Sequence, residues 1–202
     1  MKVDHIMYAA PSLAEGIASI DSLLKVTASG GGGHPGQGTR NALLSFGNDQ
    51  YLEIIAPDPD QQLAGTMGAQ LERLAQSEVR TFAVATDNFA LVRSHAETFG
   101  FRTRMQEMSR QLPDGQLLNW QLLFVTGHGF KGCMPFFINW LDSAHPSRNA
   151  PVAGNLTRVR ALVEDVERYR NFIDALALDV QVESGSGTIM FSLDSSAGDV
   201  EV

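Results

Sequence analysis

The stretch His34–Pro59, HPGQGTRNALLSFGNDQYLEIIAPDP, decides the fold expected for this chain. Two runs of strand-forming residues, 39–46 and 50–56, flank the turn-forming triplet Gly47-Asn48-Asp49. The second run carries one acid, Glu53, among apolar neighbours. Because a buried carboxylate is costly without a polar partner, Glu53 needs a partner from elsewhere in the chain.

The first strand supplies a candidate for that partner. Residues 2–10 alternate in character and are rich in strand formers, a pattern that places Val3, His5 and Met7 on one face. Helical spacing of apolar residues then predicts an amphipathic helix over residues 12–25. We therefore expect His5 and Glu53 to face each other across one sheet.

The order strand, helix and three strands recurs along the chain. We assign the first βαβββ module to residues 1–59, a helical connection to 60–78, a second module to 79–148 and a truncated third module to 155–202. Such a repeat predicts an α+β fold in which curved mixed sheets surround an open cleft, with a partial third module at the C-terminus.

The run Gly30–Gly33 has two interpretations. It is either a flexible edge or tight turn, or a backbone that lets a ligand approach closely. A phosphate-binding P-loop is excluded, because no lysine followed by serine or threonine comes after the glycines.

Composition limits the partners and the compartment. The chain has 202 residues, of which 44% are hydrophobic, as in a globular protein. Its net charge of -8 argues against a nucleic-acid partner, because contact with phosphates needs a basic surface. No apolar run approaches the ~18 residues of a membrane span, so no membrane partner is expected. The single cysteine, Cys133, fits a reducing compartment, and we expect the cytoplasm. The expected partner is a small-molecule ligand in the cleft, and a homodimer is left open.

Three segments carry a family resemblance: DHIMYAAPSL, GGHPGQGTRNALLSFG and YLEIIAPDP. They resemble the glyoxalase-like domain family of the glyoxalase/bleomycin-resistance/extradiol-dioxygenase superfamily, the vicinal oxygen chelate proteins. The resemblance covers residues 2–148, whereas the third repeat matches only in pattern. It implies paired βαβββ modules that form a cleft, with a divalent cation held there in the metal-dependent members.

The metal ligands implied by the resemblance are incomplete. By position, the first module supplies His5 and Glu53 for zinc, nickel, manganese or iron. In the second module Asn139 matches Glu53 and offers an amide oxygen. Either Arg80 or Thr81 matches His5; neither is a strong ligand, and Arg80 cannot ligate at all. His34 could complete the site or simply be exposed. A site without any metal is equally tenable.

Three interpretations of His5 and Glu53 stay open: metal ligands, a pair that binds or deprotonates a substrate without metal, or a buried structural pair. Other polar or aromatic residues are candidates for substrate binding, with backbone satisfaction, core packing or surface exposure as the simpler alternatives. They are Thr39, Asn41, Trp120, Phe137, Trp140 and His145. The arginines of the second module, at positions 80, 102, 104 and 110, indicate either an anionic substrate or an ordinary surface.

The predicted function is a glyoxalase-like, metal-assisted lyase, isomerase or dioxygenase that acts on a small metabolite, with His5 and Glu53 as catalytic residues. The alternative is a non-catalytic protein that binds and sequesters a small molecule, and it is motivated by the ligands missing from the second module.

Overall fold

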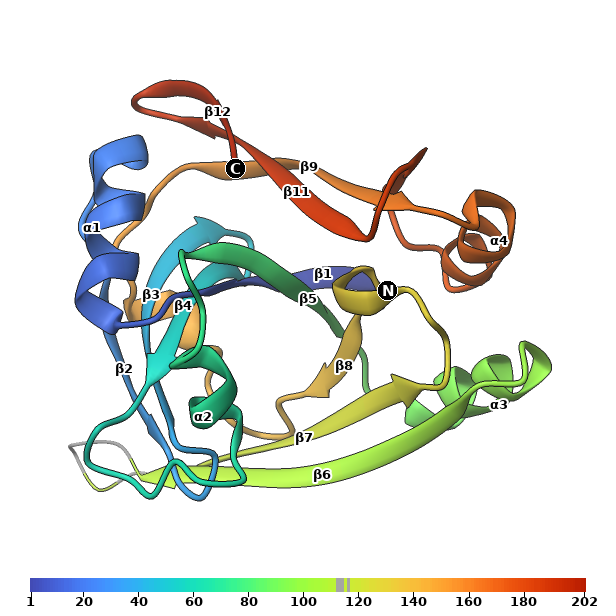
Figure 1. The fold of residues 1–202 in the computed structure, drawn as a ribbon, viewed down its shortest axis with the longest axis horizontal. Coiled ribbons are helices and arrows are strands. Elements are labelled where there is room, and N and C mark those ends of the chain that lie inside the picture. The colour runs from blue at the N-terminus through green and yellow to red at the C-terminus, as the bar shows by residue number, and fades with distance from the viewer. Residues whose placement is uncertain (112–114, 116) are drawn as a thin grey trace.

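The structure, a computed structural model, describes residues 1–111, 115 and 117–202. One eight-stranded mixed sheet curls around a concave side, and a four-stranded sheet lies across its outer face (Figure 1). This confirms the predicted α+β fold class with a curved mixed sheet.

The eight-stranded sheet consists of two halves with the same internal order. The first half comprises β1 (Lys2–Ala9), α1 (Leu13–Leu24), β2 (Ser29–His34), β3 (Thr39–Gly47) and β4 (Gln50–Pro57). The second half comprises β5 (Glu78–Ala85), α3 (Phe89–Thr98), β6 (Arg102–Gln111), β7 (Leu117–Thr126) and β8 (Phe136–Asn139). In each half the first strand pairs in parallel with the fourth, and the antiparallel pair β1–β5 joins the halves into the order β2-β3-β4-β1-β5-β8-β7-β6.

Three short helices complete this part of the chain: α2 (Met67–Leu71) and the 3₁₀ turns at Lys131–Cys133 and Pro146–Asn149. Helix α2 covers part of the concave side, where Leu71 joins a small apolar cluster with Met7 and Trp120. The larger core lies on the convex side, between the sheet and α1, α3 and the second sheet. The concave side is therefore the less filled of the two.

The glycine run forms an edge strand of the large sheet rather than a tight turn. A Cβ at Gly31 would clash with the backbone and side-chain oxygens of Asn41, and Gly31 has a φ of 81°. Only glycine therefore fits this position, and the run brings β2 directly against Asn41.

The third segment contains β9 (Asn155–Val163), α4 (Val166–Ala175), β10 (Gln181–Ser184), β11 (Thr188–Ser195) and β12 (Gly198–Glu201). Its strand order is β10-β9-β11-β12, with β9 parallel to β10 and antiparallel to β11. The predicted order of elements is present, but the segment does not copy the first two modules. The reason is that the strand after α4 returns beside β9, whereas β2 and β6 lie at the far ends of their halves. Among the described residues, none of the helices has the length and apolar character needed to cross a membrane.

Candidate active site

A β-bulge in β1 shapes the site. Val3 pairs with Val84 and His5 pairs with Ala83, so Asp4 is one extra residue in the ladder between β1 and β5. A bulge of this kind re-aims the side chains around it. His5 lines the cavity of the concave side while Val3 packs in the convex core. The prediction that Val3 shares a face with His5 is therefore wrong, because the bulge shifts the alternation by one residue.

The Asp4 side chain is 1% exposed and accepts three hydrogen bonds. The Nδ1 atom of His5 lies 2.6 Å from Asp4 Oδ1, and Trp140 Nε1 donates to Oδ2 at 3.0 Å. His145 Nε2 lies 3.2 Å from the same Oδ2. Burial favours the neutral acid, but the hydrogen bonds from His145 and His5 outweigh it and hold the pKa of Asp4 well below its usual range. Asp4 is therefore a buried carboxylate.

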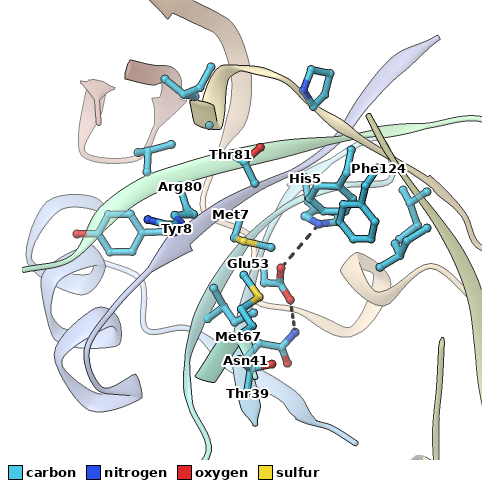
Figure 2. A pocket seen from close by; sticks show the side chains of 18 of the residues that line it. His5, Met7, Tyr8, Thr39, Asn41, Glu53, Met67, Arg80, Thr81 and Phe124 are labelled. Carbon is cyan, nitrogen blue, oxygen red and sulfur yellow. Dashed lines mark hydrogen bonds and ion pairs between the residues drawn. The ribbon is translucent and has the colours of Figure 1, made fainter. Parts of the chain in front are cut away.

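Asp4 determines which nitrogen of His5 faces the cavity. Because a carboxylate only accepts, His5 donates from Nδ1. Its Nε2 then points toward Glu53, 3.7 Å from Oε2 (Figure 2). The ring of Tyr51 stacks on the imidazole at a centroid distance of 4.5 Å, and Phe136 contacts it edge-on at 5.4 Å. The imidazole is thus fixed by one hydrogen bond and two aromatic contacts.

Glu53 is held by Asn41, whose amide has a defined orientation. Asn41 Oδ1 accepts from Gly32 N at 3.0 Å and lies 3.4 Å from Arg110 Nη1. The Nδ2 atom therefore faces the other way and donates to Glu53 Oε1 at 2.7 Å (Figure 2). One Glu53 oxygen is engaged by Asn41, and the other faces His5.

His34 is a third member of the cluster. Its Nε2 lies 3.2 Å from Asn41 Nδ2 and its Nδ1 lies 3.0 Å from Thr39 Oγ1. Burial lowers the pKa of His34, so the neutral ring accepts from Asn41 at Nε2 and donates to Thr39 from Nδ1. Both ring nitrogens of His34 are consequently occupied by protein groups.

The cluster closes one end of a cavity of about 990 Å³. Its walls are mainly apolar, and they include Met7, Met67, Met108, Trp120, Phe124 and Phe136. The far end passes residues 78–81 at the start of β5, where the large sheet contacts β11, and there reaches residues 187–190. The lining also includes charged groups away from the cluster, among them Glu78, Arg80 and Lys131. A mainly apolar cavity with a small set of converging polar groups is the usual design of a small-molecule site.

A family model described as a glyoxalase-like domain matches residues 3–177. The chain belongs to the glyoxalase-like domain family. No curated protein matches the sequence.

Among solved structures, this glyoxalase-like protein resembles a hypothetical protein from Staphylococcus aureus, with a TM-score of 0.71 and 17% identity over 99% of this chain and 98% of that one. It also resembles a variant of Streptomyces coelicolor methylmalonyl-CoA epimerase in complex with 2-nitronate-propionyl-CoA. A methylmalonyl-CoA epimerase in complex with methylmalonyl-CoA and NH4+ is equally similar. Both give a TM-score of 0.50 and 17% identity over 71% of this chain and 97% of theirs. At these identities the likeness concerns the fold.

The residues of this glyoxalase-like protein fit the implied metal poorly. His34 Nε2 lies 3.7 Å from Glu53 Oε1, but its lone pair is already used by Asn41. Two atoms of this cluster are then left to ligate a metal, His5 Nε2 and Glu53 Oε2, whereas catalytic metal sites usually have three protein ligands. Within the described ranges, no group of three or more His, Cys, Asp or Glu residues is placed to hold a metal ion.

Asn139 does not join this cluster. It lines a separate surface depression together with Phe89 and Arg93, and its Oδ1 accepts from Leu141 N at 2.9 Å. The prediction that Asn139 shares a site with Glu53 is wrong, because Asn139 lies in that depression rather than along the cavity.

Four of the six predicted substrate-binding residues line the cavity: Thr39, Asn41, Trp120 and Trp140. Phe137 does not, because the alternation of β8 turns it into the convex core and places Phe136 on the cavity wall. His145 lies behind Asp4 with its Nδ1 2.7 Å from Ser147 Oγ, so it contacts the site through the carboxylate.

The sequence reasoning missed Asp4 and Tyr51 and left Arg110 undecided. Asp4 had a usable signal, since it is a second acid in an apolar strand, directly beside the candidate histidine. Tyr51 had one too, because it lies two residues from Glu53 on the same strand and therefore on the same face.

Proposed function

We propose that this protein is an acid–base enzyme, an isomerase that moves a proton at a carbon next to a carbonyl group of a small metabolite. The observation that supports it is the His5 Nε2 atom, fixed by Asp4 and placed 3.7 Å from Glu53 Oε2 at the cavity wall. Both catalytic candidates come from the sequence prediction, and Asp4 is the addition that gives His5 a defined orientation.

His5 is the base in this proposal. In the neutral form of the ring, the proton is held on Nδ1 by Asp4 and the Nε2 lone pair is presented to a substrate C–H. The imidazolium that forms lies between the Asp4 carboxylate at Nδ1 and the Glu53 carboxylate near Nε2. Both charges stabilise it, and the apolar walls strengthen that attraction by excluding water.

The spacing of the two groups favours isomerisation over inversion. Inversion by two bases needs one base on each face of the reacting carbon, and no carbon fits between atoms that are 3.7 Å apart. His5 and Glu53 therefore reach the substrate from the same side. This arrangement suits removal of a proton from carbon and its return to a neighbouring atom on that side.

The metal-assisted and dioxygenase versions of the predicted function depend on a donor set that the described residues do not assemble. The sequestering function, in contrast, remains the outcome to be excluded, because an apolar cavity binds ligands whether or not chemistry follows.

Exchange of carbon-bound hydrogen tests the proposal. The protein is incubated in D2O with 2-oxo acids, 2-hydroxy ketones and methylmalonyl-CoA, and the loss of the α-proton signal is followed by proton NMR. We include methylmalonyl-CoA because one protein of similar fold is in complex with it. We expect exchange with at least one class, and its loss in both His5→Gln and Glu53→Gln.

Glu107→Gln is the matched control, because Glu107 lies exposed on β6 and pairs with Gln121. It should exchange at the wild-type rate. Tight binding of a panel member without any exchange would establish the sequestering function instead.

A further inference from the structure

Arg110 reaches the polar end of the cavity from the opposite edge of the sheet. It lies on β6, whereas Asn41 and Glu53 lie on β3 and β4. The curl of the sheet brings its Nη1 to 3.4 Å from Asn41 Oδ1, and its side chain passes over Gly32, where an added Cβ would lie 3.4 Å from Arg110 Cδ. The Arg110 side chain therefore packs directly over the backbone of β2 at residue 32.

The guanidinium of Arg110 is poorly satisfied there. Its Nε is buried without a hydrogen-bond partner, and among the described residues it forms no ion pair with a carboxylate. Burial lowers the pKa of Arg110 in spite of the opposing charge of Glu53. Buried parts of charged side chains are usually paired, so the unpartnered Nε marks Arg110 as a candidate for an anionic partner.

Arg160 shows what a satisfied arginine looks like in the same chain. Its Nε and Nη2 donate to the two oxygens of Glu183 at 2.9 and 2.8 Å, and its Nη1 donates to Glu201 at 3.0 Å. The edge formed by Nε and Nη2 is the one that grips a carboxylate with two parallel hydrogen bonds. On Arg110, Nη1 faces Asn41, and among the residues that the structure describes no acceptor meets the Nε atom of that edge.

We propose that Arg110 anchors the carboxylate of an amphipathic ligand whose apolar body packs against Met108, Trp120 and Phe124. These three residues line the cavity together with Arg110. Asn41 lies between the two charges, because its oxygen faces Arg110 and its amide nitrogen binds Glu53. The ligand carboxylate and the Glu53 carboxylate are therefore kept on different sides of one amide. The inference rests on the proposed function, because it names the substrate class of the same cavity.

Calorimetry with paired probes tests the anchor. The probes are phenylacetate, 3-phenylpropionate, 4-phenylbutyrate and octanoate, each compared with its neutral primary amide. We expect at least one carboxylate to bind about ten-fold or more tightly than its amide, because only the carboxylate offers two charged acceptors to the guanidinium. Arg110→Gln should remove that preference while amide binding persists, and Arg110→Lys should retain part of it.

Arg102→Gln is the matched control, since Arg102 is exposed on the same strand and outside the cavity lining. It should keep the wild-type preference. If Arg110→Gln keeps the preference for carboxylates over amides and only lowers the melting temperature, Arg110 has a structural role in packing β6 against β2, and the proposed carboxylate anchor is refuted. Failure of every carboxylate to bind at millimolar concentration overturns it as well.

The same variants separate this inference from the proposed function. His5→Gln should keep the carboxylate preference and lose hydrogen exchange. Hydrogen exchange without a carboxylate preference would support the isomerase proposal and refute the role of Arg110 as anchor. A carboxylate preference without exchange of any panel member would support the anchor and refute the isomerase proposal.

Discussion

Replacing Asp4 by asparagine keeps the shape of the side chain and removes the charge that orients His5. Two donors, Trp140 Nε1 and His145 Nε2, meet at Oδ2, and His5 Nδ1 alone meets Oδ1. The amide satisfies most donors when its oxygen takes the Oδ2 position and its NH2 group faces His5. His5 must then accept at Nδ1 and carry its proton on Nε2, which is the wrong tautomer for a base facing the cavity.

The magnitude follows from the three hydrogen bonds. Bonds to a charged group contribute about 1.5–3 kcal/mol each and neutral ones about 0.5–1.5 kcal/mol, so conversion of three costs roughly 3–4 kcal/mol. Relief from burying a carboxylate offsets part of this. We expect the free energy of unfolding to fall by about 1–3 kcal/mol, which lowers the melting temperature by roughly 2–4 °C per kcal/mol in a chain of this size. Hydrogen exchange should slow by about 10²–10⁴-fold.

The pH dependence has a defined sign. The pKa of Asp4 is lower in the folded protein than in the unfolded chain, where it is about 3.9. Its contribution to stability is therefore complete above that value and is lost as the pH falls further below it. The difference in unfolding free energy between wild type and Asp4→Asn should shrink as the pH falls below about 4, where Asp4 takes up a proton in the unfolded chain.

Three measurements check this prediction: long-range ¹⁵N NMR of the His5 ring, urea unfolding from neutral to acidic pH, and hydrogen exchange. Asp142→Asn, at an exposed position, is the control and should behave like wild type. If His5 keeps its proton on Nδ1 in Asp4→Asn, or if the stability difference persists unchanged in acid, the assignment of Asp4 is refuted.

Three further predictions concern the glycine strand, the metal and the two faces of β8. Gly31→Ala should destabilise the fold by about 2 kcal/mol or more in urea unfolding, because the new Cβ meets Asn41 oxygens at a positive φ. Calorimetry with zinc, nickel, manganese or iron(II) should show no micromolar binding, and metal binding that His5→Gln abolishes would contradict the two-donor assignment. Phe137→Ala should cost about 3–5 kcal/mol of stability and leave ligand binding by the folded protein unchanged, whereas Phe136→Ala, on the cavity wall, should also weaken ligand binding in calorimetry; the reverse result for binding would mean that the faces are misassigned.

Local patterns account for most elements of the large sheet. Alternation predicted residues 2–10, 39–46 and 50–56 as strands, and the structure has β1, β3 and β4 within a residue or two of those limits. The approach of His5 to Glu53 followed from the same reasoning, because a carboxylate in an apolar strand needs a polar partner and His5 lies in another largely apolar strand. The structure brings these two side chains to 3.7 Å.

Features set by pairing between distant strands could not be predicted this way. Alternation assigned Asp4 to the face opposite His5, and the bulge that changes this depends on the register of β1 with β5. Arg110 reaches the site only because the sheet curls until β6 approaches β2, which no local pattern encodes. The strand order of the third segment likewise depends on where the strand after α4 pairs.

The distances around His5 discriminate between the interpretations that the sequence left open. A purely structural pair would be expected to close both sides of the imidazole with short, buried contacts. Instead the Nδ1 side is closed at 2.6 Å by Asp4, whereas the Nε2 side lies 3.7 Å from Glu53 and both residues line the cavity. Glu53 has a short bond of 2.7 Å from Asn41 at its other oxygen, so its position does not depend on His5. Two groups that are each anchored elsewhere and left apart from each other are arranged to meet a third partner, and this asymmetry favours a substrate over a structural ion pair.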